Sequence, residues 1–154
     1  MTFSNFMNSQ QINLDDLIIR IREQGNRLTP QRLAVLKTLI GNKEHLSAED
    51  VYERVRKEFP MIGLATVYKT VNTLKAIGEV SEINMKDGGS RIDGYSAVPH
   101  PHIICLKCEE VIDVEIDGLE VLRDSIKDTH QYQIKNFRLD FFGICPKCQA
   151  VLEK

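Results

Sequence analysis

Hydrophobic residues recur every three or four positions through the first half of the chain, and this spacing predicts four amphipathic helices. The expected buried faces are Leu14, Leu17, Ile18 and Ile21; Leu33, Leu36 and Ile40; Val51, Val55 and Phe59; and Leu64, Val67, Val71 and Leu74. The first three helices are preceded by capping residues, at Asn13, at Thr29 before Pro30, and in a capping box, Ser47–Asp50. They are expected to end at Gly25, Gly41 and Pro60.

The fourth predicted helix, residues 64–76, has an outer face of small, polar and weakly basic side chains. This face consists of Ala65, Thr66, Lys69, Asn72 and Thr73, with Tyr68 on its flank. It lacks the Glu–Lys pairs that are usual on a solvated helix. It suits insertion into a DNA major groove, where hydroxyl, amide and cationic groups meet phosphates and base edges. An ordinary exposed face is the alternative interpretation of this helix taken alone.

A β-hairpin is predicted directly after this helix. Residues 78–84 alternate as in a strand, Lys86–Gly89 contains the turn signal Asp-Gly, and residues 90–93 form the returning strand. Helices followed by a hairpin predict a winged helix, which is a variant of the helix-turn-helix. The second helix of that motif enters the DNA groove, and the hairpin lies over the backbone.

The second half of the chain predicts a smaller α+β module. Residues 102–105 and 111–115 are expected as short strands, 118–129 as a helix and 132–142 as a long strand. We therefore divide the chain into a winged-helix domain at 1–91, a hinge at 92–99 and a second domain at 100–154. A domain of about 55 residues buries little core of its own. A metal ion and a partner subunit are therefore expected to stabilise it.

Charge and targeting signals narrow the class of protein. The net charge is −2, but residues 1–91 hold 13 Lys and Arg against 11 Asp and Glu, whereas residues 92–154 hold 7 against 11. This asymmetry permits nucleic-acid binding by the first half without establishing it. Residues 1–7 do not resemble a signal peptide, and no stretch approaches the roughly 20 apolar residues of a membrane span. We therefore expect a cytoplasmic protein that does not bind membranes.

All four cysteines lie in two Cys-x-x-Cys pairs, with ligands at Cys105, Cys108, Cys145 and Cys148. Two such pairs supply the four thiolates of a closed, tetrahedral Zn(II) site. Because the pairs are far apart in sequence, the metal would join two distant segments, and its binding energy would contribute to folding. The alternatives are two disulfides, or one redox pair with a spare pair. Zinc is favoured in a reducing cytoplasm.

Histidines and carboxylates form a second candidate metal site. His100 and His102 alternate in an extended segment, so both side chains point the same way and can reach one ion. Asp93, Asp113 and His45 are the further candidates. Three imidazoles and two carboxylates would suit Fe(II) or Mn(II). Alternatively, the His-x-His pair is an incidental surface feature, His45 caps a loop, and Asp113 is a solvated strand residue.

Several segments resemble the ferric uptake regulator family, and they are Arg27–Arg32, His45–Tyr52, Ala65–Val71, Pro99–Cys105 and Gly143–Cys145. The resemblance extends from about Leu14 to Cys148. Members of this family are homodimeric, metal-dependent repressors in which a winged helix is joined by a hinge to an α+β dimerisation domain. The resemblance implies the same α+β fold here, with 100–154 as the dimerisation and metal-binding domain. It also implies a double-stranded, pseudo-palindromic DNA operator as partner.

The resemblance assigns roles to particular residues. The positions that match the family's regulatory metal ligands are His45, Asp93, His100, His102 and Asp113. They imply one Fe(II) or Mn(II) site in addition to structural Zn(II). Tyr68 and Lys69 would contact DNA in the groove or along its backbone, and Arg27 would approach the minor groove. Thr66 and Asn72 of the same predicted helix face complete the DNA-binding candidates.

Within the family, the sequence favours the peroxide-responsive repressor branch. Asp93 stands at a position where many iron-responsive members have Glu and where the peroxide-responsive repressors typically have Asp. Four zinc cysteines are also typical of the peroxide-responsive branch. Many members have an additional His-rich metal site, but its positions here hold Pro99, Pro101 and Phe137. We therefore predict that the chain lacks this additional site. The resemblance to the peroxide-responsive branch further predicts that His45 or His100 is oxidised when peroxide reacts with bound Fe(II).

The predicted mechanism couples this site to DNA binding. The regulatory ion would bridge the two domains and select a closed dimer that binds the operator, and oxidation of His45 or His100 would release it. The alternative is an iron- or zinc-responsive regulator of uptake genes that does not sense peroxide. An enzyme, such as a non-haem iron oxygenase, is not expected, because a substrate pocket signature is missing and the winged helix would be unexplained. His130 has no assigned role.

Overall fold

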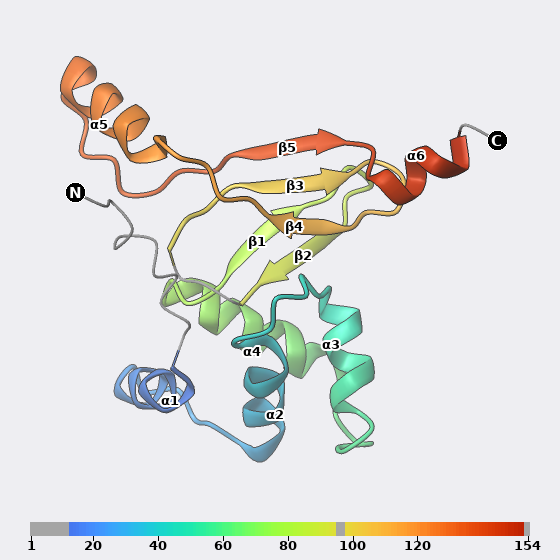
Figure 1. The fold of residues 1–154 in the computed structure, drawn as a ribbon. Helices are drawn as coiled ribbons and strands as arrows, with labels where there is room; N and C mark the ends of the chain where they lie inside the picture. Colours follow the sequence, from blue (N-terminus) through green and yellow to red (C-terminus); the bar gives the residue numbers. More distant parts are fainter. Residues whose placement is uncertain (1–12, 95–97, 153–154) are drawn as a thin grey trace. The chain divides into compact units, whose positions relative to one another are not determined.

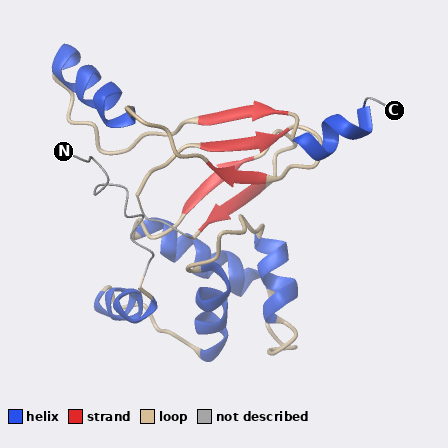
Figure 2. Ribbon diagram, viewed as in Figure 1, coloured by secondary structure: helices blue, strands red, loops and turns tan. Residues whose placement is uncertain are grey.

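The computed structural model describes residues 13–94 and 98–152. The chain divides into two compact units, of which the first ends at Val98 and the second begins at Pro99. Figure 1 gives the order of the elements along the chain, and Figure 2 separates helices from strands. Residues 95–97 of the predicted hinge lie outside the described residues. Residues 1–12 also lie outside them, and these include residues 1–7, which are not expected to form a signal peptide.

The first unit is a winged helix, as predicted. Its described elements are α1 (Leu14–Glu23), α2 (Pro30–Leu39), α3 (Ala48–Val55), α4 (Leu64–Ala76), β1 (Ser81–Asn84) and β2 (Ser90–Asp93). β1 and β2 pair antiparallel, with Ile83 opposite Arg91. Ile92 and Asp93 are the last two residues of β2, as the predicted returning strand 90–93 requires, although the predicted domain division placed them in the hinge.

Side-chain caps determine where the first three helices begin. Asn13 accepts a hydrogen bond from a backbone N–H of α1 at 2.9 Å, and Thr29 accepts one from α2 at 3.3 Å. Ser47 and Asp50 form the predicted capping box of α3, in which each backbone N–H donates to the other side chain at 3.0 Å. α3 ends at Val55 instead of near Pro60, because tighter i→i+3 turns follow it.

The hydrophobic core of the first unit draws on all four helices and the hairpin. It contains Leu17, Ile21, Val35, Leu36, Leu39, Leu46, Ala48, Val51, Val55, Ile62, Val67, Val71, Leu74, Val80 and Ile92. The predicted face of α2 was partly wrong, because Val35 and Leu39 are buried with Leu36, whereas Leu33 and Ile40 are half-buried. Apolar residues occur around much of α2, so spacing alone does not select the buried face.

The second unit contains a small mixed sheet. Its described elements are β3 (His102–Cys105), β4 (Val111–Asp113), α5 (Leu119–His130), β5 (Asp140–Gly143) and α6 (Pro146–Leu152). The strand order is β4-β3-β5, with β3 antiparallel to β4 and parallel to β5. The predicted strand 132–142 was wrong over most of its length, because β3 supplies hydrogen-bond partners to residues 140–143 alone. α6 was not predicted.

Very little of the second unit is buried. The buried hydrophobic residues in its described part are Ile104 and Cys105. α5 has an amphipathic sequence but no buried residue, and Leu122 and Ile126 on its apolar face are 56% and 43% exposed. This agrees with the expectation that a domain of this size needs further stabilisation. Among the helices of the described residues, none is both long and apolar enough to cross a membrane.

Candidate metal centres and nucleic-acid face

The four cysteines converge in the second unit from the end of β3, the turn after it, and the start of α6. One sulfur from each lies within 4.8 Å of the others. The sulfurs of Cys108 and Cys145 are 3.7 Å apart, and all four residues are free thiols. Sulfurs at tetrahedral corners about 2.3 Å from one Zn(II) lie about 3.8 Å apart, whereas a disulfide is about 2.05 Å long. The spacing therefore fits zinc, and no disulfide joins these four cysteines.

Backbone N–H groups stabilise the thiolate form of Cys105. N–H groups at Cys108, Cys145 and Lys107 lower the pKa of Cys105 to about 6, and those of Lys107 and Cys145 lie 3.4 Å from its sulfur. The thiol of Cys145 beside Cys148 raises the pKa of Cys148 to about 12. Ionisation of all four thiols is therefore unfavourable unless a bound cation compensates the negative charges of the thiolates. Metal binding would release the remaining thiol protons.

The second unit also holds three of the candidate regulatory ligands. The β3–β4 register places His102 opposite Asp113. Asp113 Oδ1 lies 3.1 Å from His100 Nε2 and 3.7 Å from His102 Nε2, and the two imidazole centroids are 4.6 Å apart. Two ligand atoms about 2.1 Å from one ion, at roughly a right angle, are about 3.0 Å apart. These three side chains therefore fit one metal ion with small adjustments.

The remaining two candidates, His45 and Asp93, lie in the first unit. An antiparallel bridge joins Leu46 to Ile92, and the Ile92 N–H donates to the Leu46 carbonyl at 2.8 Å. His45 and Asp93 are the adjacent residues on these two paired segments. Leu46 and Ile92 point into the core, so the side chains of His45 and Asp93 lie together on the opposite side of the two paired segments. Asp93 is only 2% exposed, and carboxylates at such depth are usually paired or bound to a metal.

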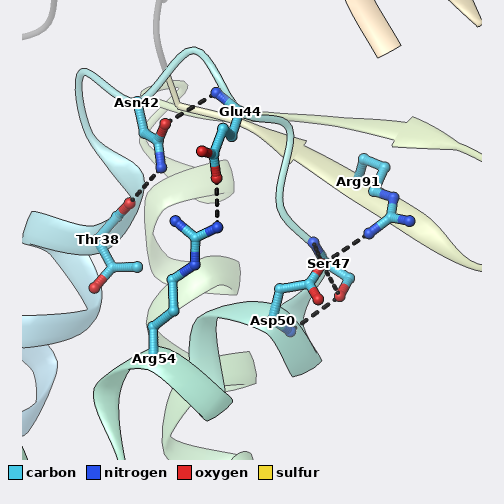
Figure 3. A network of polar contacts seen from close by, with 7 residues as sticks. All are labelled: Thr38, Asn42, Glu44, Ser47, Asp50, Arg54 and Arg91. Carbon is cyan, nitrogen blue, oxygen red and sulfur yellow. Dashed lines mark hydrogen bonds and ion pairs between the residues drawn. The ribbon is translucent and has the colours of Figure 1, made fainter. Parts of the chain in front are cut away.

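The segment carrying His45 is fixed on its N-terminal side by a chain of polar contacts (Figure 3). The Asn42 side-chain amide donates to the Thr38 carbonyl at 3.3 Å, and its oxygen accepts the Glu44 N–H at 2.9 Å. Glu44 in turn forms an ion pair with Arg54 of α3. These contacts tie the segment to the end of α2 and to the exposed side of α3.

On its C-terminal side, the same segment is tied to the hairpin. Arg91 of β2 pairs with Asp50 at 2.8 Å, and Asp50 also accepts a hydrogen bond from the Ser47 hydroxyl at 2.7 Å. Hydrogen bonds from Ser47, with a smaller contribution from the Arg91 charge, hold the pKa of Asp50 below its ordinary value. The cap of α3 and the strand that ends at Asp93 are therefore linked within one network (Figure 3).

The predicted nucleic-acid residues are accessible on the first unit. Tyr68, Lys69 and Asn72 are exposed on α4, Thr66 is half-buried, and Arg27 is exposed between α1 and α2. On the opposite side of α4, Val67, Val71 and Leu74 are buried in the core as predicted, whereas Leu64 is half-buried.

Sequence reasoning missed one neighbour of this face, Glu49. The Tyr68 hydroxyl donates to the Glu49 carboxylate at 2.6 Å, which lowers the pKa of Glu49 and raises that of Tyr68. Nothing in the spacing of the sequence indicates this contact, because it joins the first turn of α3 to the middle of α4. The contact fixes where the Tyr68 hydroxyl lies on the outer face of α4.

A winged helix with a polar outer helix, followed by a unit that gathers thiolate and His/Asp ligands, defines a metal-binding transcription regulator. A profile of the ferric uptake regulator family matches residues 23–142. The chain is 42% identical over 145 residues to the ferric uptake regulation protein of Bacillus subtilis strain 168, covering 89% of this chain and 97% of that protein. It is 34% identical over 136 residues to the peroxide-responsive repressor PerR of Staphylococcus saprophyticus, covering 88% and 91%.

A solved structure supports the same assignment at the level of the fold. The Helicobacter pylori ferric uptake regulator superposes with a TM-score of 0.77 at 24% identity, covering 90% of this chain and 95% of that one. The chain belongs to the ferric uptake regulator family. Proteins of this family bind DNA and act as dimers, so the chain is a metal-responsive transcription regulator and not an enzyme.

Proposed function

We propose that the chain is a homodimeric repressor whose operator binding requires Fe(II) or Mn(II), with Zn(II) as a structural ion. The regulatory ligands would be His45, Asp93, His100, His102 and Asp113, and the zinc ligands Cys105, Cys108, Cys145 and Cys148. The observation that carries the proposal is the pairing of ligands within each unit: His45 beside Asp93 through one antiparallel bridge, and His102 beside Asp113 through another pairing. Mixed nitrogen and oxygen donors suit Fe(II) and Mn(II).

The candidate ligands of one unit alone do not complete a regulatory metal site. The first unit offers one imidazole and one carboxylate, and the second offers two imidazoles and one carboxylate. Ligation of one ion by both halves would restrict how the first unit is oriented and would favour the orientation that binds the operator. In a dimer, the two α4 helices would then enter successive major grooves, roughly 34 Å apart, of a pseudo-palindromic operator. Such a regulator acts in the cytoplasm, where DNA and reduced thiols coexist.

The DNA contacts would come from the exposed face of the first unit. Tyr68, Lys69 and Asn72 would approach base edges or phosphates from α4, with Thr66 at the edge of this face. Arg27 would approach the minor groove beside it. We expect Lys69→Ala to weaken binding to all DNA sequences and to reduce its salt dependence, because a phosphate contact is insensitive to sequence.

The finer proposal is that this repressor senses peroxide. Bound Fe(II) would activate peroxide by one-electron reduction; overall, one peroxide oxygen would be added to a ring carbon of an imidazole ligand and the other would leave as water, so that peroxide is the oxidant. His45 is held between α2 and the cap of α3, and oxygen added to its ring would abolish the imidazole that the first unit contributes as a ligand. His100 is the second candidate, because its Nε2 lies beside Asp113. In either case the constraint on the first unit would be lost, and the operator would be released.

The alternative function is an iron-responsive regulator of metal uptake that does not sense peroxide. The identity to the Bacillus subtilis ferric uptake regulation protein, 42%, exceeds the 34% to the staphylococcal peroxide-responsive repressor, and this favours the alternative. Asp93 and the four-cysteine site favour peroxide sensing through the resemblance to that branch.

Peptide mass spectrometry separates the two functions. Protein loaded with Fe(II) is exposed briefly to low peroxide, with Mn(II)-loaded protein as control, and operator binding is measured on the same samples. One added oxygen on His45 or His100 with iron alone, together with loss of operator binding, would support the peroxide sensor. Unmodified histidines with intact operator binding would support the iron-responsive regulator. Operator binding that is independent of either metal would contradict both.

A further inference from the structure

One row of side chains crosses the sheet of the second unit and contains a carboxylate that the ligand set does not use. The strand registers place His102 of β3 opposite Asp113 on β4 and opposite Asp140 on β5. The imidazole therefore lies between two carboxylates. Its Nε2 is 3.7 Å from Asp113 Oδ1, and its Nδ1 is 3.4 Å from Asp140 Oδ1.

The surroundings of Asp140 suit a supporting role. The side chains of Asp140 and His102 are only 8% and 7% exposed, so bulk water competes little for their contact. Arg138 Nε donates to the other carboxylate oxygen, Oδ2, which compensates the charge of Asp140 and leaves Oδ1 directed at the imidazole. A carboxylate can only accept, so the contact with His102 requires a proton on Nδ1.

We propose that Asp140 is a positioning residue for His102. By accepting the Nδ1 proton it selects the neutral tautomer in which Nε2 carries no proton and can act as a ligand, and it holds the ring so that this nitrogen is directed toward Asp113. Carboxylates in this position raise the basicity of a ligating imidazole, and their removal typically costs about 10- to 100-fold in metal affinity. This inference rests on the proposed function, because it assumes that His102 is a regulatory ligand.

The test is a titration of zinc-loaded, full-length protein with Mn(II), followed by electron paramagnetic resonance. We expect Asp140→Ala to weaken Mn(II) binding by about 10- to 100-fold, while zinc content and the unfolding midpoint stay near those of the wild type. Asp140→Asn should restore much of the affinity, because its amide oxygen can still accept the Nδ1 proton. The matched control is Asp124→Ala, which removes a carboxylate that is also paired with an arginine, Arg123, but lies exposed on α5.

Co(II) provides a second measurement that a purely structural role would not change. If Asp140 orients His102, the visible absorption bands of Co(II) in the regulatory site should shift in Asp140→Ala and return toward the wild-type spectrum in Asp140→Asn. Wild-type Mn(II) affinity in Asp140→Ala, or a loss that is matched by loss of zinc and of folded protein, would overturn the inference.

The same titration distinguishes a wrong role for Asp140 from a wrong proposed function. If the zinc-loaded wild type binds no Mn(II), the proposed regulatory site is wrong. If the wild type binds Mn(II) and His102→Ala abolishes binding while Asp140→Ala does not, the proposed function stands and the role of Asp140 is refuted.

Discussion

Gly94 lies directly after Asp93 and close to the backbone of Leu39, and replacing it with alanine tests how firmly the proposed ligand Asp93 is held. A Cβ atom at position 94 would lie 2.5 Å from the Leu39 carbonyl oxygen and 2.9 Å from its carbonyl carbon. The Gly94 carbonyl also accepts the Gly41 N–H at 3.0 Å, so both sides of this contact are backbone. Backbone atoms cannot rotate away as a flexible side chain does. The end of β2 must therefore move away from the end of α2.

The expected cost follows from this geometry. Overpacking typically destabilises by about 1–3 kcal/mol, and we expect the upper part of that range here because the obstructing atoms are backbone. For a unit of about 100 residues this corresponds to a fall of roughly 10–20 °C in melting temperature. Because Asp93 moves with Gly94, Gly94→Ala should also weaken Mn(II) binding.

The assay combines thermal unfolding of zinc-loaded protein with an Mn(II) titration. Gly89→Ala is the matched control, since a Cβ atom there meets nothing within 4 Å and the backbone is not in the left-handed region. The reasoning would be refuted if Gly94→Ala melted within about 2 °C of the wild type and bound Mn(II) equally well, because roughly 0.5 kcal/mol or less would then separate the two proteins.

Three further predictions address other contacts. Because the pKa of Asp50 is lowered in the folded protein, the ionised carboxylate stabilises the fold above the ordinary pKa of 3.8, and this contribution is lost as the pH falls through the lowered pKa. Asp50→Asn should therefore remove this part of the acid-unfolding curve, and an unchanged curve would contradict the assignment. Glu49→Ala should free the Tyr68 hydroxyl and change operator affinity measured by fluorescence anisotropy, whereas Glu49→Gln, which can still accept its proton, should change it less; equal effects would argue against positioning. Leu122→Glu should shift the protein from dimer toward monomer in analytical ultracentrifugation, because the apolar face of α5 is exposed within one chain, and an unaltered dimer would exclude this face from the interface.

The features that could be predicted from sequence are those set by neighbouring residues. The caps at Asn13, Thr29 and Ser47 depend on hydrogen bonds that span only two or three positions, and each was found where predicted. The hairpin turn is equally local. Two Cys-x-x-Cys pairs predicted a four-sulfur cluster because the motif itself limits what four thiols can bind.

The features that could not be predicted depend on segments distant in sequence. Residues 132–139 alternate in polarity like a strand, but alternation does not reveal whether an edge is available for pairing, and β3 pairs with residues 140–143 alone. Asp140 meets His102 through that parallel register, across 38 positions of sequence. The contact between Tyr68 and Glu49 arises in the same way, from the packing of α3 against α4.

One cysteine of the four-sulfur cluster and one candidate regulatory ligand lie on the same short strand, and this links the properties of the two sites. β3 runs from His102 to Cys105, so the first residue is a candidate regulatory ligand and the last a zinc ligand, about 10 Å apart. At one end the His102 N–H donates to the Leu139 carbonyl at 3.0 Å, and at the other the Leu106 N–H donates to Gly143 at 2.8 Å, which locks the register with β5. Zinc that joins Cys105 to Cys145 would stabilise this register and keep Asp140 beside His102.

Removal of zinc should therefore weaken Mn(II) binding although no cysteine is a proposed ligand of Mn(II). Because coupling between two binding equilibria is reciprocal, bound Mn(II) should slow the extraction of zinc by a chelator. The matching experiment follows zinc release with a chromogenic chelator in the presence and absence of Mn(II), using Asp140→Ala as the variant that lacks the side-chain contact between β5 and His102. Equal release rates with and without Mn(II) in the wild type would show that the two sites are independent despite the shared strand. A protective effect that persists unchanged in Asp140→Ala would locate the coupling in β3 and β4 instead.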